Sequence, residues 1–288
     1  MTVLELEPDD FGPFFRAIHG VDPFPWQARL LLQIAEADVW PDVLDLPTGS
    51  GKTVALNIAV FHLAMDAHKG ENRRAPARIA FVVDRRLIVD DAYNRAKRIE
   101  TVLASVARDA SAPEVVRKVT TRLGRLTERP ERPLLARRLR SGMPRQDDWT
   151  RTPTQPTILC STVDQVGSRL LFRGYGLSDS MKPVHAGLLG SDCLILLDQV
   201  HLSEPFRQTL KLVARHRVSW RDPDWSPATP FATALLTATP SRASGEPFGL
   251  NLDDRNHPRL RLRLEVAKPA TLVAISGKKD RRTDDNER

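Results

Sequence analysis

A short apolar run leads into a loop of small residues, and this loop opens a helical pattern over residues 43–56. The loop reads Pro47-Thr48-Gly49-Ser50-Gly51-Lys52-Thr53. Glycine permits backbone angles that a side chain would forbid, so the loop amides can converge on phosphate groups at a helix N-terminus. The stretch therefore predicts a strand, a phosphate-binding loop and a helix, in that order.

The loop also predicts a cofactor, ATP with Mg²⁺. Lys52 is expected to reach the β- and γ-phosphates, and the Thr53 hydroxyl to hold the metal. The pattern departs from G-x-x-x-x-G-K-[ST] only at its first position, which is Leu46. We expect all seven residues from Pro47 to Thr53 to bind the nucleotide.

A second motif, Cys193-Leu194-Ile195-Leu196-Leu197-Asp198-Gln199-Val200-His201, places an acid at the tip of a buried strand. Asp198 is expected to hold Mg²⁺ opposite Thr53. Gln199 follows where a glutamate would activate water, and an amide can orient water but cannot accept its proton. We therefore expect Lys52, Asp198, Gln199 and His201 to be the catalytic residues, with slow turnover.

Two further features flank these motifs. Gln27 lies on the first turn of a predicted helix some 20 residues before the loop, and its amide can both donate to and accept from adenine. The apolar run 231–240 ends in a Thr-Ala-Thr triplet. We expect Thr237 and Thr239 to couple the nucleotide to the Asp198–His201 turn.

Polar groups follow two other predicted strands. Arg85 and Arg86 come after the strand at 78–83, and Thr162 ends the strand at 157–162, with Arg169 in the helix beyond. Because ligands meet the carboxyl ends of strands in an open α/β sheet, these four residues are expected to hold the phosphates of single-stranded DNA.

A basic stretch interrupts this pattern at residues 107–156. Ten Lys or Arg against two acids lie between Val115 and Arg145. Helices are predicted at 117–126 and 132–140. The stretch is either a solvated basic helix pair or a surface that guides the nucleic acid, and the net charge of +7 is compatible with a polyanionic partner.

The remaining pattern alternates strands and helices, which predicts an α/β fold, a mostly parallel sheet with helices on both faces. Helices are expected over 10–40 with a break at 21–25, and over 52–68, 87–106 and 203–219. The alternation at 259–266 predicts a half-exposed strand, and 271–275 a last strand. We divide the chain into a helical segment 1–40, a lobe 41–275 and a charged tail 276–288.

The sequence predicts no membrane span. There is no apolar run of 18 residues, and the N-terminus lacks the pattern of a signal peptide. The two cysteines, Cys160 and Cys193, lie in strand-like runs and are expected to be buried thiols of a cytoplasmic protein.

The order of Pro47–Thr53, Asp198–His201 and Thr237–Thr239 resembles the first RecA-like lobe of a P-loop helicase of superfamily 2, of the DEAD/DEAH-box kind. Two longer stretches, 161–176 and 196–206, resemble more narrowly the CRISPR-associated helicase–nuclease of type I systems, in the subtype whose helicase lobes precede the nuclease. The resemblance covers about residues 20–275.

This resemblance implies an ATP-dependent DNA helicase in antiviral defence, recruited by an RNA-guided CRISPR surveillance complex and joined to a second helicase lobe and an HD nuclease domain. No arginine-finger motif is found and no histidine is followed by aspartate, so the second lobe and the nuclease are expected to lie outside this chain. Two alternatives stay open, another DEAD/DEAH-like helicase acting on DNA or RNA, and a non-catalytic, nucleotide-gated nucleic-acid-binding module.

Overall fold

The computed structural model describes residues 5–106, 109, 111–139, 147–198, 204–219, 229–238 and 246–266. Seven strands form one sheet in the order β3-β4-β2-β5-β6-β1-β7, and every pair is parallel. The strands are β1 (Val43–Asp45), β2 (Arg78–Val83), β3 (Leu135–Leu139), β4 (Thr157–Thr162), β5 (Cys193–Asp198), β6 (Phe231–Thr237) and β7 (Phe248–Gly249).

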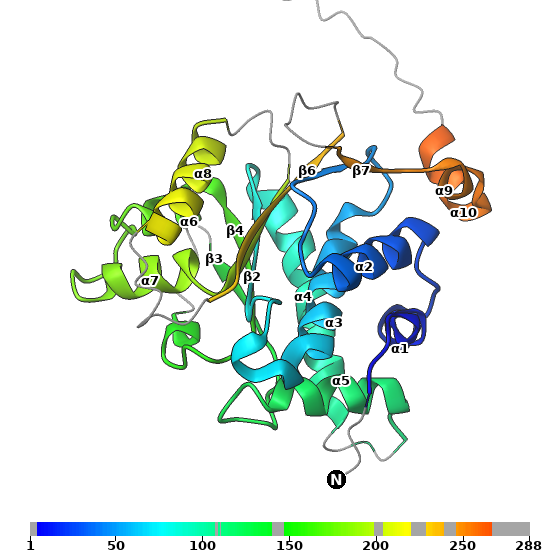
Figure 1. The fold of residues 1–288 in the computed structure, drawn as a ribbon, viewed down its shortest axis with the longest axis horizontal. Helices are drawn as coiled ribbons and strands as arrows, with labels where there is room; N and C mark the ends of the chain where they lie inside the picture. The colour runs from blue at the N-terminus through cyan, green and yellow to red at the C-terminus, as the bar shows by residue number, and fades with distance from the viewer. Residues whose placement is uncertain are drawn as a thin grey trace, which may run out of the picture.

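Helices cover both faces of this sheet (Figure 1). One face carries α1 (Phe11–His19), α2 (Pro25–Ala37), α3 (Ala55–Asp66), α4 (Arg86–Ser105) and α5 (Glu114–Gly124). The other carries α6 (Val163–Leu170), α7 (Met181–Gly190) and α8 (Glu204–Ser219). Two short helices, α9 (Leu252–Asn256) and α10 (Pro258–Glu265), follow β7. The predicted α/β fold, a mostly parallel sheet with helices on both faces, is confirmed.

The N-terminal helical segment belongs to the same core as the lobe. Phe61 on α3 packs against the rings of Phe11 and Phe14 on α1, at centroid separations of 5.6 and 5.2 Å. Eleven of the twelve residues of α3 are buried, because α3 lies between the sheet and its neighbours α1, α2 and α5. The helix that follows the glycine-containing loop 47–53 is therefore packed on all sides.

Most element predictions are confirmed, including the break between α1 and α2, the helix predicted at 87–106, which the structure has at 86–105, and the two buried cysteines. Burial raises the pKa of the Cys193 thiol to about 12. The predicted helix at 132–140 is wrong, because residues 135–139 form β3 and pair with β4.

The predicted strand at 259–266 is also wrong. Pro258 occupies the first turn of α10, where its missing N–H costs nothing, and the His257 imidazole accepts from the Leu260 N–H at 3.4 Å. Of the alternating leucines, Leu260 is buried while Leu262 is 69% exposed. The alternation therefore did not mark one buried face. The strand expected at 271–275 and the charged tail lie outside the described residues.

Candidate functional site

The loop after β1 has the backbone that its glycines predicted. Gly49 and Gly51 have φ of 90° and 87°, a region that side chains strongly disfavour. The loop leads into a single 3₁₀ turn, η2 (Lys52–Val54), which is followed directly by α3. The predicted order of strand, loop and helix is therefore present.

Two hydrogen bonds hold the centre of the loop. The Ser50 hydroxyl donates to the Pro47 carbonyl at 2.7 Å, and the Trp26 indole N–H donates to the Ser50 carbonyl at 3.1 Å. Both Ser50 and Trp26 are fully buried. Trp26 was not expected at the site; its position beside Gln27 on the first turn of α2 was the one available signal. It ties the loop to α2.

Lys52 turns back over its own loop. Its Nζ donates to the Leu46 carbonyl at 2.9 Å. Burial lowers the pKa of Lys52, while the carboxylates of Asp198 and Asp45 act in the opposite direction. The Lys52 amine is therefore partly desolvated and close enough to Asp198 to interact with its carboxylate. In such a position the positive charge of Lys52 acts more strongly than it would in water.

Asp198 lies at the carboxyl end of β5, in register with Leu236 of β6. Strand β6 separates β5 from β1, so the loop and the acid meet at the same edge of the sheet. They border one cavity of about 450 Å³, lined by Thr48, Gly49, Gly51, Lys52, Thr53, Asp198, Leu236, Ala238 and Arg263. This volume lies within the range of about 300–1,000 Å³ that holds small ligands.

The residues fit the nucleotide and metal that the sequence predicted. The cavity combines an amine, a helix N-terminus with glycines in left-handed conformation, a hydroxyl and a carboxylate. Within the described residues, no three or more His, Cys, Asp or Glu side chains are grouped so as to hold a metal by themselves. Mg²⁺ commonly takes one or two protein ligands and completes its shell with phosphates and water, which suits Thr53 and Asp198.

Gln27 is buried beside the loop, with 1% of its surface exposed. Its Oε1 accepts from the Phe24 backbone N–H at 2.9 Å, closing the first turn of α2. A Cβ on Gly51 would stand 3.4 Å from Gln27 Nε2, so the amide group faces the loop. Its predicted contact with adenine stays a prediction, with one acceptor position already used.

Thr237 ends β6 directly beside the loop strand. It is in register with Asp45 of β1, and its carbonyl accepts from the Leu46 N–H at 2.9 Å. This contact places the end of β6 against the base of the phosphate loop. The other expected residues of the two motifs, Gln199, His201 and Thr239, lie outside the described part of the chain.

The residues predicted to hold nucleic acid divide into two groups. Arg85 and Arg86 are exposed at the start of α4, and Thr162 pairs in register with Val83 at the end of β2. These three residues therefore come from neighbouring strand ends, but Thr162 is only 7% exposed, and their contact with nucleic acid stays a prediction.

Arg169 was expected to contact nucleic acid together with Arg85 and Arg86, but it does not lie at the surface. It is 3% exposed and donates to the Gln165 side chain at 2.6 Å and to His185 Nδ1 at 3.3 Å. Its guanidinium connects α6 to α7, because the helical turn that carries it faces the protein interior. As placed, this side chain does not present its charge to a nucleic-acid backbone.

The basic stretch is partly neutralised within the fold. Arg137 pairs with Asp148 and lies 3.7 Å from Glu100, and Arg138 pairs with Asp90 at 2.6 Å. By contrast Arg129 and Arg132 are exposed, before β3 at the amino edge of the sheet. The stretch is therefore neither a helix pair nor a uniformly free basic surface.

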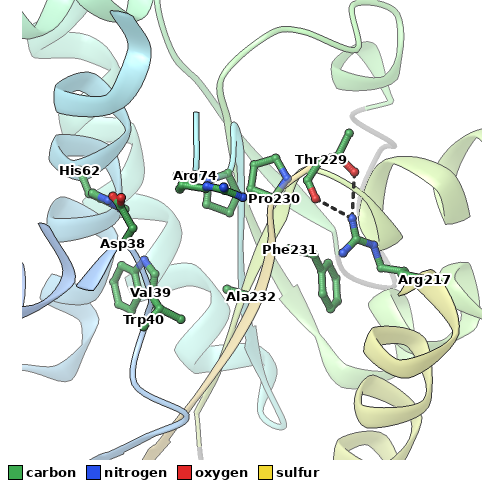
Figure 2. Close-up of a pocket in the computed structure, with 11 residues that line it drawn as sticks. Asp38, Val39, Trp40, His62, Arg74, Arg217, Thr229, Pro230, Phe231 and Ala232 are labelled. Atoms are coloured by element: carbon green, nitrogen blue, oxygen red, sulfur yellow. Dashed lines mark hydrogen bonds between the residues drawn. The ribbon is translucent and has the colours of Figure 1, made fainter. Parts of the chain in front are cut away.

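A second cavity of about 270 Å³ lies at the amino edge of the sheet. Figure 2 shows Trp40, His62 and Asp38 on one side of it and Arg217 on the other, where Arg217 donates to Thr229 at 2.8 Å. Burial lowers the pKa of His62 to about 4, so its imidazole is neutral at neutral pH. This cavity lies at the opposite edge from the phosphate loop and is not the predicted nucleotide site.

Comparison with known proteins gives a partial likeness among solved structures. No family model matches the chain, and no curated protein matches it. Among solved structures, the yeast DEAD-box splicing factor Prp28 is similar to 83% of this chain, with 13% identity and a TM-score of 0.45. The chain covers 46% of that structure's length. In the described residues, no helix is long and apolar enough to cross a bilayer.

Proposed function

We propose that this chain is the ATP-binding motor lobe of a superfamily 2 helicase. The observation that carries the proposal is the cavity at the carboxyl edge, which Lys52, Thr53 and Asp198 all line. Those three groups supply a cation for the phosphates and two oxygen ligands for Mg²⁺, which is the set that phosphoryl transfer requires. The positive φ angles of Gly49 and Gly51 let the loop backbone approach the phosphates.

In this proposal Lys52 exchanges its bond to the Leu46 carbonyl for a phosphate oxygen. The Thr53 hydroxyl and the Asp198 carboxylate hold Mg²⁺, which neutralises charge on the phosphates when bound. Gln199, directly after Asp198 in the sequence, orients the attacking water without taking its proton. Gln27, at the start of α2, contacts the adenine.

The narrower assignment rests on the sequence. The stretches 161–176 and 196–206 support a CRISPR-associated, cytoplasmic DNA helicase whose partners are single-stranded DNA, an RNA-guided surveillance complex, a second lobe and an HD nuclease. One observation favours a second candidate. Gln199 in place of a glutamate supports a nucleotide-gated nucleic-acid clamp with little turnover. Hydrolysis by a chain that includes the second lobe separates the helicase from the clamp.

Thermal unfolding with and without Mg·ATP tests the proposed function. A ligand present at 100 times its Kd stabilises the folded state by about 2.7 kcal/mol, which corresponds to roughly 5 °C for a chain of this size. We expect this shift for the wild type and for Lys211→Ala, a control on the exposed face of α8. Lys52→Ala is expected to show almost none. A shift of the same size in Lys52→Ala would contradict the assignment of the loop.

Binding of single-stranded DNA is expected to depend on salt through the exposed Arg85 and Arg86. Each phosphate contact contributes about 0.7 to the slope of log K against log salt, so Arg85→Ala/Arg86→Ala should lower the slope by about 1.4. Fluorescence anisotropy of a labelled oligonucleotide at several salt concentrations measures this slope.

A matched pair of arginines provides the control. Arg129 and Arg132 are exposed at the amino edge of the sheet, and their double alanine variant should leave the slope unchanged. The opposite result would be a lower slope for Arg129→Ala/Arg132→Ala and an unchanged slope for Arg85→Ala/Arg86→Ala. That result would place the nucleic acid on the basic stretch instead.

A further inference from the structure

Helix α10 packs against the phosphate loop, although nothing in its sequence marks it as part of the site. A Cβ on Gly49 would lie 3.2 Å from the Arg263 carbonyl oxygen, which shows how closely the helix approaches the loop. The same residue, Arg263, lines the cavity together with Lys52, Thr53 and Asp198. An arginine from the last turn of α10 therefore borders the predicted phosphate position.

Contacts with α2 hold the two elements that precede α10, β7 and α9. Arg29 of α2 pairs with Asp254 of α9 at 2.6 Å, and Asp254 is 1% exposed. Arg29 also donates to the Gly249 carbonyl at 2.6 Å and lies 4.2 Å from the centroid of the Phe248 ring. These contacts tie β7 and α9, the elements just before α10, to the helix that carries Trp26 and Gln27.

Phe24 makes a second contact with α10. The guanidinium carbons of Arg259 and Arg263 lie 5.6 and 5.3 Å from the centroid of the Phe24 ring. Such cation–π contacts are weak at exposed positions, so they orient the two side chains without immobilising them. Of the two arginines only Arg263 lines the cavity, which makes Arg259 a natural reference for it.

We propose that Arg263 is a phosphate-binding residue of the nucleotide site, supplied by α10. The proposal rests on the proposed function. Among the described residues that line the cavity, Lys52 and Arg263 are the cations and Asp198 is the acid. The triphosphate of ATP carries three to four negative charges, and the planar guanidinium forms paired hydrogen bonds to phosphate oxygens. Nucleotide binding is then coupled to the position of α9 and α10.

Titration of a fluorescent ATP analogue with Mg²⁺ tests this role in four proteins. Hydrogen bonds to charged groups are strong enough that losing one weakens binding by roughly 10-fold or more. Arg263→Ala is therefore expected to raise the Kd about 10-fold. Arg259→Ala also removes a contact with Phe24 but leaves the cavity lining intact, so its Kd should stay within about twofold of the wild type. Lys52→Ala is the reference for loss of the site.

Competition by inorganic tripolyphosphate identifies the group that Arg263 contacts. If Arg263 binds phosphate, Arg263→Ala should weaken the binding of tripolyphosphate as much as it weakens the binding of the analogue. Arg263→Lys should restore part of both affinities. A loss confined to the analogue would place Arg263 against the base and overturn the proposal. Equal Kd values for Arg263→Ala and Arg259→Ala, together with weak binding of the analogue by Lys52→Ala, would also overturn the proposal. Unchanged binding in Lys52→Ala would instead overturn the proposed function itself.

Discussion

Gln199→Glu, introduced into a chain that also contains the second lobe, is expected to raise DNA-stimulated ATP hydrolysis by about 10²–10⁴-fold, the usual contribution of a general base. Asp198, which precedes it in the sequence, is 8% exposed and lines the cavity where the γ-phosphate is expected. A carboxylate there accepts the proton of the attacking water, which an amide cannot do. Phosphate release with single-stranded DNA present measures the effect.

The same substitution in the present chain is expected to change little. An arginine finger contributes roughly 10³–10⁵ in rate, and none is found in this sequence, so the chain should have negligible ATPase activity with or without Gln199→Glu. The two defects act on one step and need not multiply. If the longer chain hydrolyses ATP at the same rate with Gln199 kept and with Gln199→Glu, position 199 does not activate water.

Asp198→Asn is expected to abolish the Mg²⁺ dependence of nucleotide binding. Even partners that only support a metal ligand are worth about 10–100-fold in metal affinity, so loss of the charged ligand itself should cost at least about 100-fold. ATP affinity in wild type should fall when Mg²⁺ is replaced by EDTA, whereas the affinity of Asp198→Asn should be the same in both conditions.

A neighbouring acid provides the control for this substitution. The Asp45 carboxylate also favours the protonated form of Lys52, but Asp45 does not line the cavity. Asp45→Asn should therefore keep its Mg²⁺ dependence. A normal response to Mg²⁺ in Asp198→Asn would remove Asp198 from the metal site.

The architecture could be predicted because its strands are buried on both faces. The runs 79–83, 158–160 and 193–197 are entirely apolar, and each is followed directly by polar residues that mark the carboxyl edge. Such runs are typical of parallel sheets. The helix predicted at 132–140 and the strand predicted at 259–266 were wrong, because arginines interrupt the apolar residues of both segments. For the first, pairing with β4 overrode the helical pattern, and for the second, the cap at His257 and Pro258 was the better signal.

The site was predictable where the local sequence determines it. Gly49, Gly51 and Lys52 lie in one loop, and Asp198 ends a strand, so motif and topology together bring them to one edge. Long-range packing decided the rest. Arg169 faces the interior because α7 packs on α6. Arg263 reaches the cavity through a chain of contacts: β7 pairs with β1, and α9, which follows β7, is held to α2 by the ion pair of Arg29 with Asp254. A single sequence contains no local signal for such contacts.

The most direct test of the motor-lobe assignment is the affinity of the chain for a fluorescent ATP analogue with Mg²⁺, measured for wild type, Lys52→Ala and Lys211→Ala. The structure places the Lys52 amine in the cavity that Asp198 also lines, so loss of this cation should raise the Kd by roughly 10-fold or more. Lys211→Ala should bind as the wild type does. Equal affinity in Lys52→Ala and wild type would contradict the account, because the phosphate loop would then not be the nucleotide site.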